Sequence, residues 1–323
     1  MEIKQIIIWG HKLHSHTHSY IHNGFFIGFN HLGYKTLWFD DNDNVSDIDF
    51  SKSLFITEHQ VNKKIPCRSD CLYLTHYIDD GDYKGVPKEN IIILRVSLRD
   101  FIEGDNNKFL NYNYESLEYG QKYEYHSKIN DYNNLYIYWA TDLLPYEIQK
   151  NIDTLTLQET KNEINFIGTC TEPFRILRNI CNIVKIPFNQ YGATFNPDSH
   201  MNKSVEDNVK LIQESLIAPA FQEDHQIQKY YIPCRIFKNI SYGKMGITNN
   251  KFIYEMFDKK LIYDENIEQA FIKSIEFEKK YTKYSRVKEL MEIVRDNHTY
   301  LNRINTIINY IHNHTNFRFT KIK

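Results

Sequence analysis

The sequence predicts an α/β protein with two doubly wound parallel sheets, one in each half of the chain. Short apolar runs of strand length alternate with helical stripes or long loops along both halves. In each half a buried strand run is followed directly by glycine, at Gly10 and at Gly168. A polar stretch, residues 150–163, lies between the halves, and 323 residues are enough for two domains of ordinary size.

In the first half, residues 6–9 predict a buried strand that ends at Gly10. Residues 19–32 carry apolar side chains at helical spacing, and Gly33 follows as a helix end. Residues 35–39 predict a second strand, and further strands are expected at 53–57, 71–76, 90–96 and 135–139. Strands that alternate with helices or long loops indicate a parallel sheet of the doubly wound type.

The second half begins after the polar stretch, which we interpret as a linker between domains 1–155 and 156–323. It predicts a strand at 164–170, a helix at 174–184, a strand at 188–191, a helix at 205–215 and a strand at 216–221. Residues 230–249 predict a loop, a short helix with Pro233 in its first turn and Gly243 at its end, and a strand at 245–248. A long helical tail, 266–312, completes two Rossmann-like domains.

Composition and charge exclude several classes of partner. A net charge of −2 and a pI near 6.7 give no electrostatic footprint for nucleic acid, and no polybasic run indicates a membrane surface. The first apolar run is too short for a signal peptide or a bilayer span, so we expect a cytoplasmic protein without stable membrane insertion. Five cysteines without a disulfide framework or a second zinc-type pair indicate reduced thiols and no metal.

Residues 230–249 contain the strongest functional signal. Arg235 and Lys238 are three apart, so they can project from one side of the predicted helix start. Two cations at a positive helix N-terminus attract phosphate, which outlines a nucleoside diphosphate site. The alternative is a solvated helix face. Asn239 is a further candidate on the same helix.

The same region resembles a known enzyme family. The Pro233-x-Arg235-x-Phe237 pattern, followed by a helix ending in Gly and a short strand, resembles the donor-binding region of group-1-type glycosyltransferases. It is most similar to their spore-maturation-like branch, as is the tail element His298-Thr299-Tyr300-x-x-Arg303. Lys238 departs from the family, which places a glutamate for donor hydroxyls there.

This resemblance implies a GT-B fold, in which two Rossmann-like domains face each other across a cleft and the terminal helices return toward the N-terminal domain. It implies metal-independent transfer of a hexosyl or deoxyhexosyl group from a UDP- or GDP-sugar to a hydroxyl of a glycan or glycoconjugate, with no other cofactor. Donor contacts are expected from the strand-to-helix turn at Gly168, Thr169 and Arg175, and from Phe221 at the end of a strand. An ordinary capped turn and plain strand packing are the alternatives for these positions.

A histidine-rich loop follows the first predicted strand, with histidines at 11, 14, 16, 18 and 22. A neutral histidine can take the proton of an acceptor hydroxyl, and His16 or His18 is our preferred catalytic base. Zinc binding and simple loop decoration are the alternatives, although the spacing matches no standard zinc site. Asp142 is an alternative catalytic carboxylate.

Two other motifs have weaker interpretations. Acids at 40, 41 and 43 follow the second strand, where a dehydrogenase binds ribose, but the first turn lacks the glycine spacing that pyrophosphate contact requires. Residues 79–82 resemble a calcium loop over four residues only and predict a turn. The rival to a transferase is a non-catalytic nucleotide- or glycan-binding protein on the same scaffold.

Overall fold

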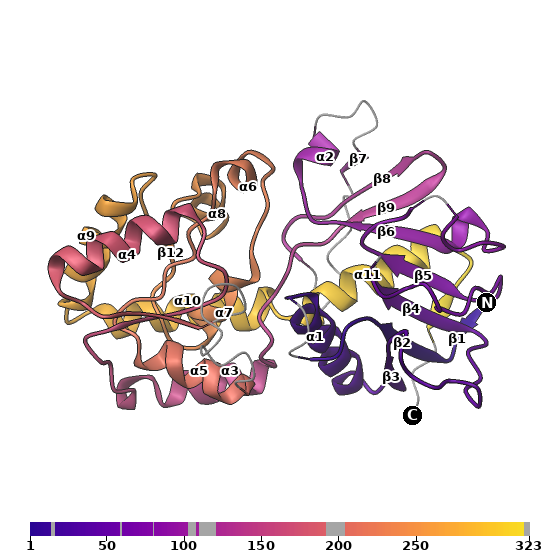
Figure 1. Cartoon of the computed structure of the whole chain (residues 1–323), viewed down its shortest axis with the longest axis horizontal. Helices are drawn as coiled ribbons and strands as arrows, with labels where there is room; N and C mark the ends of the chain where they lie inside the picture. The colour runs from indigo at the N-terminus through magenta and orange to yellow at the C-terminus, as the bar shows by residue number, and fades with distance from the viewer. Residues whose placement is uncertain are drawn as a thin grey trace. The chain divides into compact units, whose positions relative to one another are not determined.

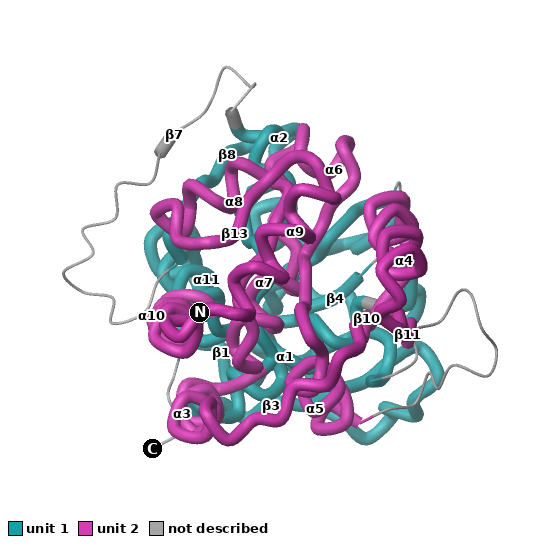
Figure 2. Tube along the Cα trace, turned by 90° about the vertical axis from the view of Figure 1, so that its left-hand side faces the viewer, with its two compact units in different colours: residues 1–142, 299–323 teal, residues 143–298 magenta. Residues whose placement is uncertain are grey.

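The computed structural model describes residues 1–13, 17–58, 60–79, 81–102, 108–109, 121–191 and 204–319. The chain forms two compact units, unit 1 from residues 1–142 with 299–323 and unit 2 from residues 143–298 (Figures 1 and 2). The prediction of an α/β fold with two Rossmann-like units is confirmed. The first boundary lies at 142/143, whereas the sequence placed it at 155/156, and the last helix belongs to unit 1.

Unit 1 is built on an eight-stranded sheet in the order β3-β2-β4-β5-β6-β9-β8-β7. All pairs are parallel except β7–β8 and β8–β9. The central strands are continuous apolar runs because both faces of the sheet are covered. The strands are β2 (Gln5–Trp9), β3 (Thr36–Phe39), β4 (Ser53–Thr57), β5 (Leu72–Thr75), β6 (Ile91–Arg95), β7 (Lys108–Phe109), β8 (Tyr125–Ile129) and β9 (Tyr132–Tyr136).

The order of these strands defines a topological switch point. β2 is the first strand of the sheet in sequence, and it lies between β3 and β4. The chain therefore moves outward in opposite directions from β2, as in the flavodoxin-like order. In open α/β sheets a ligand binds beyond the carboxyl ends of the strands at this point, which here are Trp9 and Thr57.

Two long helices of unit 1, distant in sequence, pack side by side: α1 (Thr17–His31) and α11 (Tyr300–His314). Gly24 and Gly28 of α1 permit this approach, since a Cβ at Gly24 would overlap the ring of Tyr300. The remaining elements of unit 1 are β1 (Glu2–Ile3), the 3-10 helix η1 (Lys88–Asn90), α2 (Arg99–Ile102) and β14 (Arg318–Phe319), which pairs with β1.

Unit 2 repeats the doubly wound pattern on a smaller scale. β10 (Ile164–Ile167) pairs in parallel with β11 (Phe188–Tyr191), and β12 (Ile247–Thr248) pairs with β13 (Ile262–Tyr263). Residues 216–221 bridge the two pairs through Leu216 N to Glu163 O (2.7 Å) and Ala220 N to Ile247 O (2.9 Å). The first strand, β10, thus lies between β11 and residues 216–221, so the same switch point recurs.

The helices of unit 2 surround these strands (Figure 1). They are α3 (Pro145–Asp153), the 3-10 helix η3 (Leu155–Leu157), α4 (Glu172–Val184), α5 (Val205–Glu214), α6 (Asp224–Gln228), α7 (Cys234–Ser241), α8 (Lys251–Met256), α9 (Ile267–Glu278) and α10 (Lys283–Asn297). Phe174, Leu177 and Cys181 of α4 fill a core with Phe166 and Phe221.

Two local predictions were wrong. Residues 217–221 are buried, and the segment 216–221 is bonded to both neighbours, but it does not form a regular strand, because a single backbone hydrogen bond joins it to each side. The predicted linker, 150–163, contains the end of α3 and all of η3. The predicted helical tail is confirmed: it comprises three helices, α9, α10 and α11, and Thr299 is the N-cap of the last of them.

Candidate functional site

Arg235 is a partly buried cation at the switch point of unit 2. Pro233 is the N-cap of α7, one residue before the predicted first turn, and it places Arg235 on that turn. The guanidinium lies 4.8 Å from the ring centroid of Phe166 and 5.1 Å from that of Phe174, and Nη2 donates a 3.4 Å hydrogen bond to the carbonyl of Ile167. No carboxylate of the described residues is within ion-pair distance of it. Burial lowers the pKa of Arg235, which remains a cation.

The position directly after β10 requires glycine. Gly168 has φ of +135°, and a Cβ built on it would lie 2.6 Å from Nη2 of Arg235. Its amide donates to the carbonyl of Tyr191 (2.7 Å), and its carbonyl accepts from Nε2 of Gln190 (3.1 Å). The turn is therefore fixed on both sides, and the arginine packs against its bare backbone.

Three other residues that were predicted to contact the sugar-nucleotide donor differ in their exposure to solvent. Thr169 is exposed, directly after the glycine turn. Arg175 is also exposed and its guanidinium pairs with Glu172 at 2.7 Å, so its charge is already neutralised by a neighbour. Lys238 is partly buried on α7, one turn after Arg235.

Phe221 and Asn239 are buried. The Phe221 side chain is 2% exposed and packs against Phe174 in the core of unit 2, which is the arrangement of plain strand packing. Asn239 donates its amide hydrogen to the carbonyl of Ala218 (2.8 Å) and so fixes residues 216–221 against α7. No feature of the structure tests their contact with a donor, which stays a prediction.

A buried amide network that the sequence did not reveal continues this edge of unit 2. The backbone amide of Gln222 donates to Oδ1 of Asn249 (2.9 Å), and its backbone carbonyl accepts from Nδ2 of Asn249 (2.8 Å). The side-chain Oε1 of Gln222 accepts from Nδ2 of Asn250 at 2.8 Å. Its Nε2 donates to the carbonyl of Tyr231 (2.9 Å). The network holds the loop before α7 to the end of β12.

A second cluster lies at the switch point of unit 1, where β2 and β4 end. Glu58 follows β4 and is fully buried, with its Oε1 2.7 Å from Nδ1 of His11 and its Oε2 2.7 Å from Nδ1 of His18. Burial alone would raise the pKa of this carboxyl, but the contact with His18, the nearby imidazole of His22 and the hydrogen bond from His11 hold it well below its usual range. Glu58 is therefore a buried carboxylate.

Two more imidazoles complete this cluster. The ring of His76, which follows β5, stacks on His18 and His22 with centroids 5.5 and 5.8 Å apart, and it meets Trp139 edge-on at 5.3 Å. His22 is fully buried against Gly10. The structure thus gathers His18 with three histidines and a glutamate, whereas His14 and His16 lie outside the described residues.

The other acids singled out from the sequence have structural partners. Asp41 accepts hydrogen bonds from Nε1 of Trp9 and from the amides of Lys63 and Lys64, and Asp43 pairs with Lys12 at 2.9 Å. These contacts tie together the loops after β2, β3 and β4. Asp142 is buried at the end of the first segment of unit 1.

The His298–Arg303 element is built into the fold on both sides of the unit boundary. His298 stacks on Phe237 within unit 2, with centroids 4.6 Å apart. Within unit 1, the amide of Thr299 donates to Asn302 at the start of α11 (2.8 Å). The fully buried Arg303 donates to the carbonyls of Tyr138 (2.7 Å) and Trp139 (3.1 Å) and lies over the Tyr138 ring.

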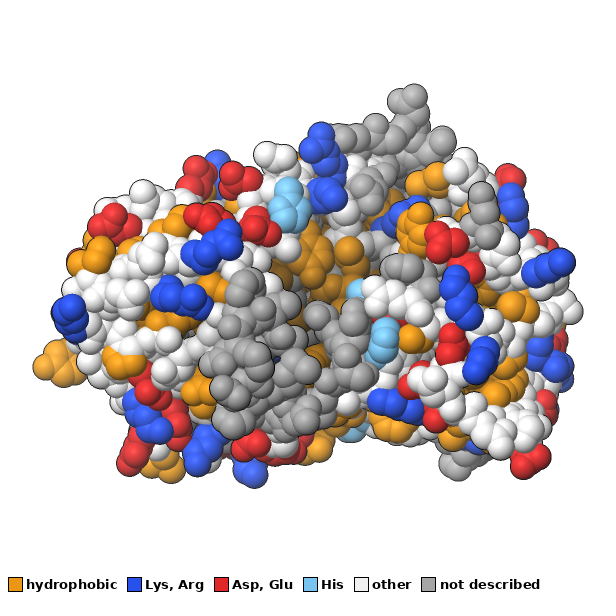
Figure 3. All heavy atoms as spheres, viewed as in Figure 1, with side chains coloured by type: hydrophobic (Ala, Val, Ile, Leu, Met, Phe, Trp, Pro, Cys, Tyr) orange, Lys and Arg blue, Asp and Glu red, His pale blue; other side chains and the backbone are white. Residues whose placement is uncertain are grey.

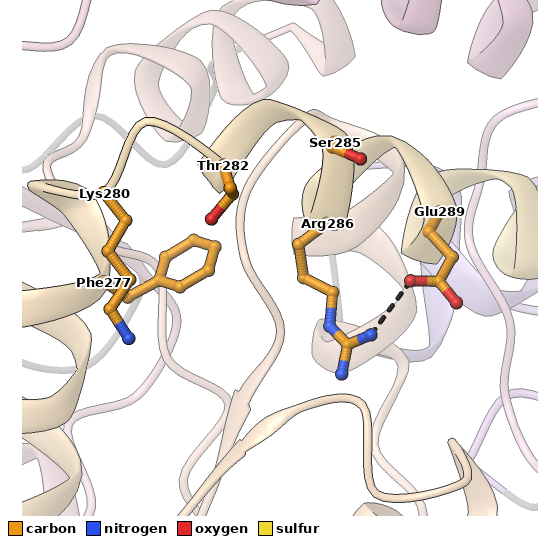
Figure 4. Close-up of a pocket in the computed structure, with 6 residues that line it drawn as sticks. All are labelled: Phe277, Lys280, Thr282, Ser285, Arg286 and Glu289. Carbon is orange, nitrogen blue, oxygen red and sulfur yellow. Dashed lines mark hydrogen bonds and ion pairs between the residues drawn. The ribbon is translucent and has the colours of Figure 1, made fainter.

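A surface pocket between the end of α9 and the start of α10 offers a contrast with the Arg235 site (Figure 4). It is lined by Phe277, Lys280, Thr282, Ser285, Arg286 and Glu289. Arg286 pairs with Glu289 at 2.9 Å, and Glu289 also binds Lys260 at 2.8 Å. Its arginine therefore has a counter-charge, unlike Arg235.

Two observations on the described residues bear on other classes of site. No group of three or more histidine, cysteine, aspartate or glutamate side chains there has an arrangement that could hold a metal ion. No helix in this part of the chain is long and apolar enough to span a bilayer. Figure 3 shows acidic and basic side chains interspersed on the face drawn.

These features define a class of protein: two doubly wound α/β units, one with a partly buried arginine that has no carboxylate partner among the described residues, and one with a carboxylate–histidine cluster. A scan of protein-family models and a search of curated proteins each find no match.

Two solved structures are similar to the chain, each with a TM-score of 0.46, 11% identity, and coverage of 96% of this chain and 98% of the other. One is T4 phage BGT in complex with its UDP-glucose substrate. The other is the DNA modifying enzyme beta-glucosyltransferase in the presence and absence of uridine diphosphoglucose.

Proposed function

We propose that the protein is a glycosyltransferase that moves a sugar from a nucleoside diphosphate sugar to a hydroxyl acceptor. The observation that carries this proposal is Arg235, a partly buried guanidinium without a carboxylate partner in the described residues, at the switch point of a doubly wound unit. A cation in such a place gains most from a ligand that brings its own negative charge. The diphosphate of a sugar nucleotide is such a ligand.

The surroundings of Arg235 suit a diphosphate. The guanidinium packs against the rings of Phe166 and Phe174, which restricts its movement before a ligand arrives. The backbone of Gly168, which has no side chain, allows phosphate oxygens to approach. The first-turn amides of α7 add a positive helix end, and Lys238 supplies a second cation on the same helix. These groups would stabilise the negative charge that develops on the leaving diphosphate.

Unit 1 would supply the base. An acceptor hydroxyl needs a group that takes its proton, and an imidazole has a suitable pKa at neutral pH. His18 is the described member of the predicted pair of bases, and its imidazole is 31% exposed, whereas its carboxylate neighbour Glu58 is fully buried. This role belongs to an inverting reaction, in which one hydroxyl displaces the diphosphate directly.

The proposal is tested by a screen followed by a turnover assay. UDP, GDP, CMP and dTDP are compared in thermal-shift measurements, and the sugar nucleotides of the base that stabilises the protein are then incubated with it. Release of nucleoside diphosphate above the buffer rate is expected, even as slow hydrolysis without an acceptor. Binding without release from any donor would instead indicate the non-catalytic binding protein, and no binding of any nucleotide would contradict both.

A further inference from the structure

Glu58 has a distinctive arrangement within the cluster of unit 1, because each carboxylate oxygen has its own imidazole. Oε1 accepts from Nδ1 of His11 at 2.7 Å and also from the backbone amide of His11 at 3.3 Å. Oε2 lies 2.7 Å from Nδ1 of His18. The two histidines come from different elements, the loop after β2 and the first turn of α1, and the same buried carboxylate joins them.

We propose that Glu58 is a positioning residue that holds His11 and His18 in one tautomer, with Nδ1 protonated and Nε2 as the basic nitrogen of each ring. An ionised carboxylate has lone pairs and no proton to donate, so an imidazole nitrogen 2.7 Å from it must carry the proton. A lone pair on Nδ1 at that distance would repel the carboxylate. In both rings Nδ1 therefore carries the proton, and Nε2 is the basic nitrogen.

The exposed fractions of the three side chains agree with a buried positioning carboxylate and two histidines nearer to the surface. Glu58 is fully buried, while the side chains of His11 and His18 are 26% and 31% exposed. Their Nδ1 atoms lie against the buried carboxylate, so each histidine joins a buried charge to the partly exposed surface of the unit.

The negative charge of Glu58 also stabilises a proton that is added to the histidine cluster. The charged or titratable groups that act on the carboxylate are imidazoles: His11 after β2, and His18 and His22 on α1. His76, which follows β5, stacks on both α1 histidines. A proton gained by His18 at Nε2 makes an imidazolium, and the adjacent carboxylate stabilises it. Repulsion from a second imidazolium in the same stack opposes a further proton.

This assignment rests on the proposed function where it concerns catalysis. In the transfer step the acceptor O–H bond breaks and its proton moves to Nε2 of His18. The acceptor oxygen forms a bond to the anomeric carbon, and the bond from that carbon to the diphosphate oxygen breaks. The nucleoside diphosphate leaves with the electron pair. Glu58 does not touch the substrate and acts only through the imidazole.

The tautomers of the wild-type protein give a test that needs no substrate. Long-range ¹H–¹⁵N correlation spectra are recorded at the alkaline end of the histidine titrations, with His11→Asn and His18→Asn spectra to assign the signals. A protonated Nδ1 and an unprotonated Nε2 are expected for both rings. A neutral Nε2–H tautomer in either ring would overturn the assignment, whether or not the protein proves to be a transferase.

Glu58→Gln provides the second test. A carboxamide offers one acceptor and one donor, so one of the two histidines must turn its Nδ1 into an acceptor and move its proton to Nε2. With donor and acceptor present, kcat is expected to fall about 100-fold with little change in the donor KM.

Glu124→Gln is the matched control, because it removes another buried carboxyl of unit 1 outside the cluster. It is expected to leave the tautomers and kcat unchanged. If Glu58→Gln lowers stability but leaves the histidine tautomers and kcat as in the wild type, Glu58 is merely structural and the proposal fails. If Glu58→Gln does not fold, the wild-type spectrum alone decides the assignment.

Discussion

Two charges within the fold have opposite surroundings. Glu58 is surrounded by imidazoles that keep it ionised, whereas Arg235 has aromatic faces and one long hydrogen bond to a carbonyl. A charge that is stabilised by groups of the protein itself can orient those groups without a ligand. A cation that the described residues leave without an acid is better explained by binding an anion.

Gly168→Ala is expected to weaken nucleotide binding about tenfold, because the new Cβ would push against the guanidinium of Arg235. The positive φ of Gly168 adds strain to any other residue there. Gly85→Ala is the control, since Gly85 also has positive φ, but a Cβ at that position would meet no atom within 4 Å. Calorimetric titration with nucleotide compares the two, and equal affinities would contradict the packing argument.

Glu124 predicts a pH dependence of stability. Burial raises the pKa of Glu124 to about 7, against an ordinary value of 4.5, while the hydroxyl of Thr306 donates to it at 2.8 Å. In the unfolded chain the carboxyl of Glu124 loses its proton at a lower pH than it does in the folded protein. The free energy of unfolding therefore falls as the pH rises from about 4.5 to about 7, by about 3 kcal/mol in total.

Glu124→Gln keeps an acceptor for Thr306 and cannot ionise. Denaturant unfolding at about pH 5 and about pH 8 should therefore show a smaller loss of stability on the alkaline side for this variant than for the wild type. The same loss in both proteins would show that Glu124 is not the group responsible.

At the scale of elements, the packing of α1 on α11 depends on two glycines that differ in what lies opposite. The Cβ of alanine at Gly24 would overlap the ring of Tyr300, which is wedged edge-on against Phe25 with centroids 4.9 Å apart. At Gly28 it would lie 2.6 Å from Cδ1 of Ile304, the end of a flexible side chain. The first site is rigid and the second can adjust.

Gly24→Ala is expected to destabilise unit 1 by about 1–3 kcal/mol, because overpacking outweighs the gain of about 1 kcal/mol in helix propensity. Gly28→Ala shares that gain and should cost less. Thermal unfolding of both variants measures the difference. A Gly24→Ala protein as stable as the wild type would mean that α11 does not pack as described.

The strands and helices were largely predictable because each carries its own periodic pattern, as the agreement of β4 with residues 53–57 shows. The site was less predictable. Gly168 and Arg235 were candidates, yet the contact between them joins residues far apart in sequence. Glu58 was missed although it follows a buried strand, since its importance comes from His11 and His18, which only tertiary structure brings to it.

At the scale of the whole molecule, both units share one order, with the first strand between the second strand and a third segment, which is β4 in unit 1 and residues 216–221 in unit 2. In each unit the candidate residues follow the strands at the switch point, Gly168 in unit 2 and Glu58 in unit 1. The two ends of the chain belong to the same unit (Figure 2), so unit 2 is a continuous insertion, residues 143–298.

This organisation predicts how fragments behave. Residues 143–298 should fold alone, with a dispersed NMR spectrum and a cooperative unfolding transition, because they form a compact unit and the core cluster around Phe166, Phe174 and Phe221 consists of residues within the fragment. Residues 1–142 should not, since they lack α11 and the buried Arg303. Joining 299–323 to 1–142 through a short linker should restore folding. A well-folded 1–142 fragment would contradict the assignment of α11 to unit 1.

The most direct test of the central claim is the nucleotide affinity of Arg235→Ala, measured by isothermal titration calorimetry with the diphosphate found in the screen. Arg286→Ala is the control, because Arg286 also belongs to unit 2 but is paired with Glu289 at 2.9 Å and was not predicted to contact the donor. A loss of about 2–3 kcal/mol in binding free energy is expected for Arg235→Ala, as for a charge-assisted contact, with little change for the control. Unchanged affinity in a folded Arg235→Ala protein would contradict the claim that this arginine holds the donor.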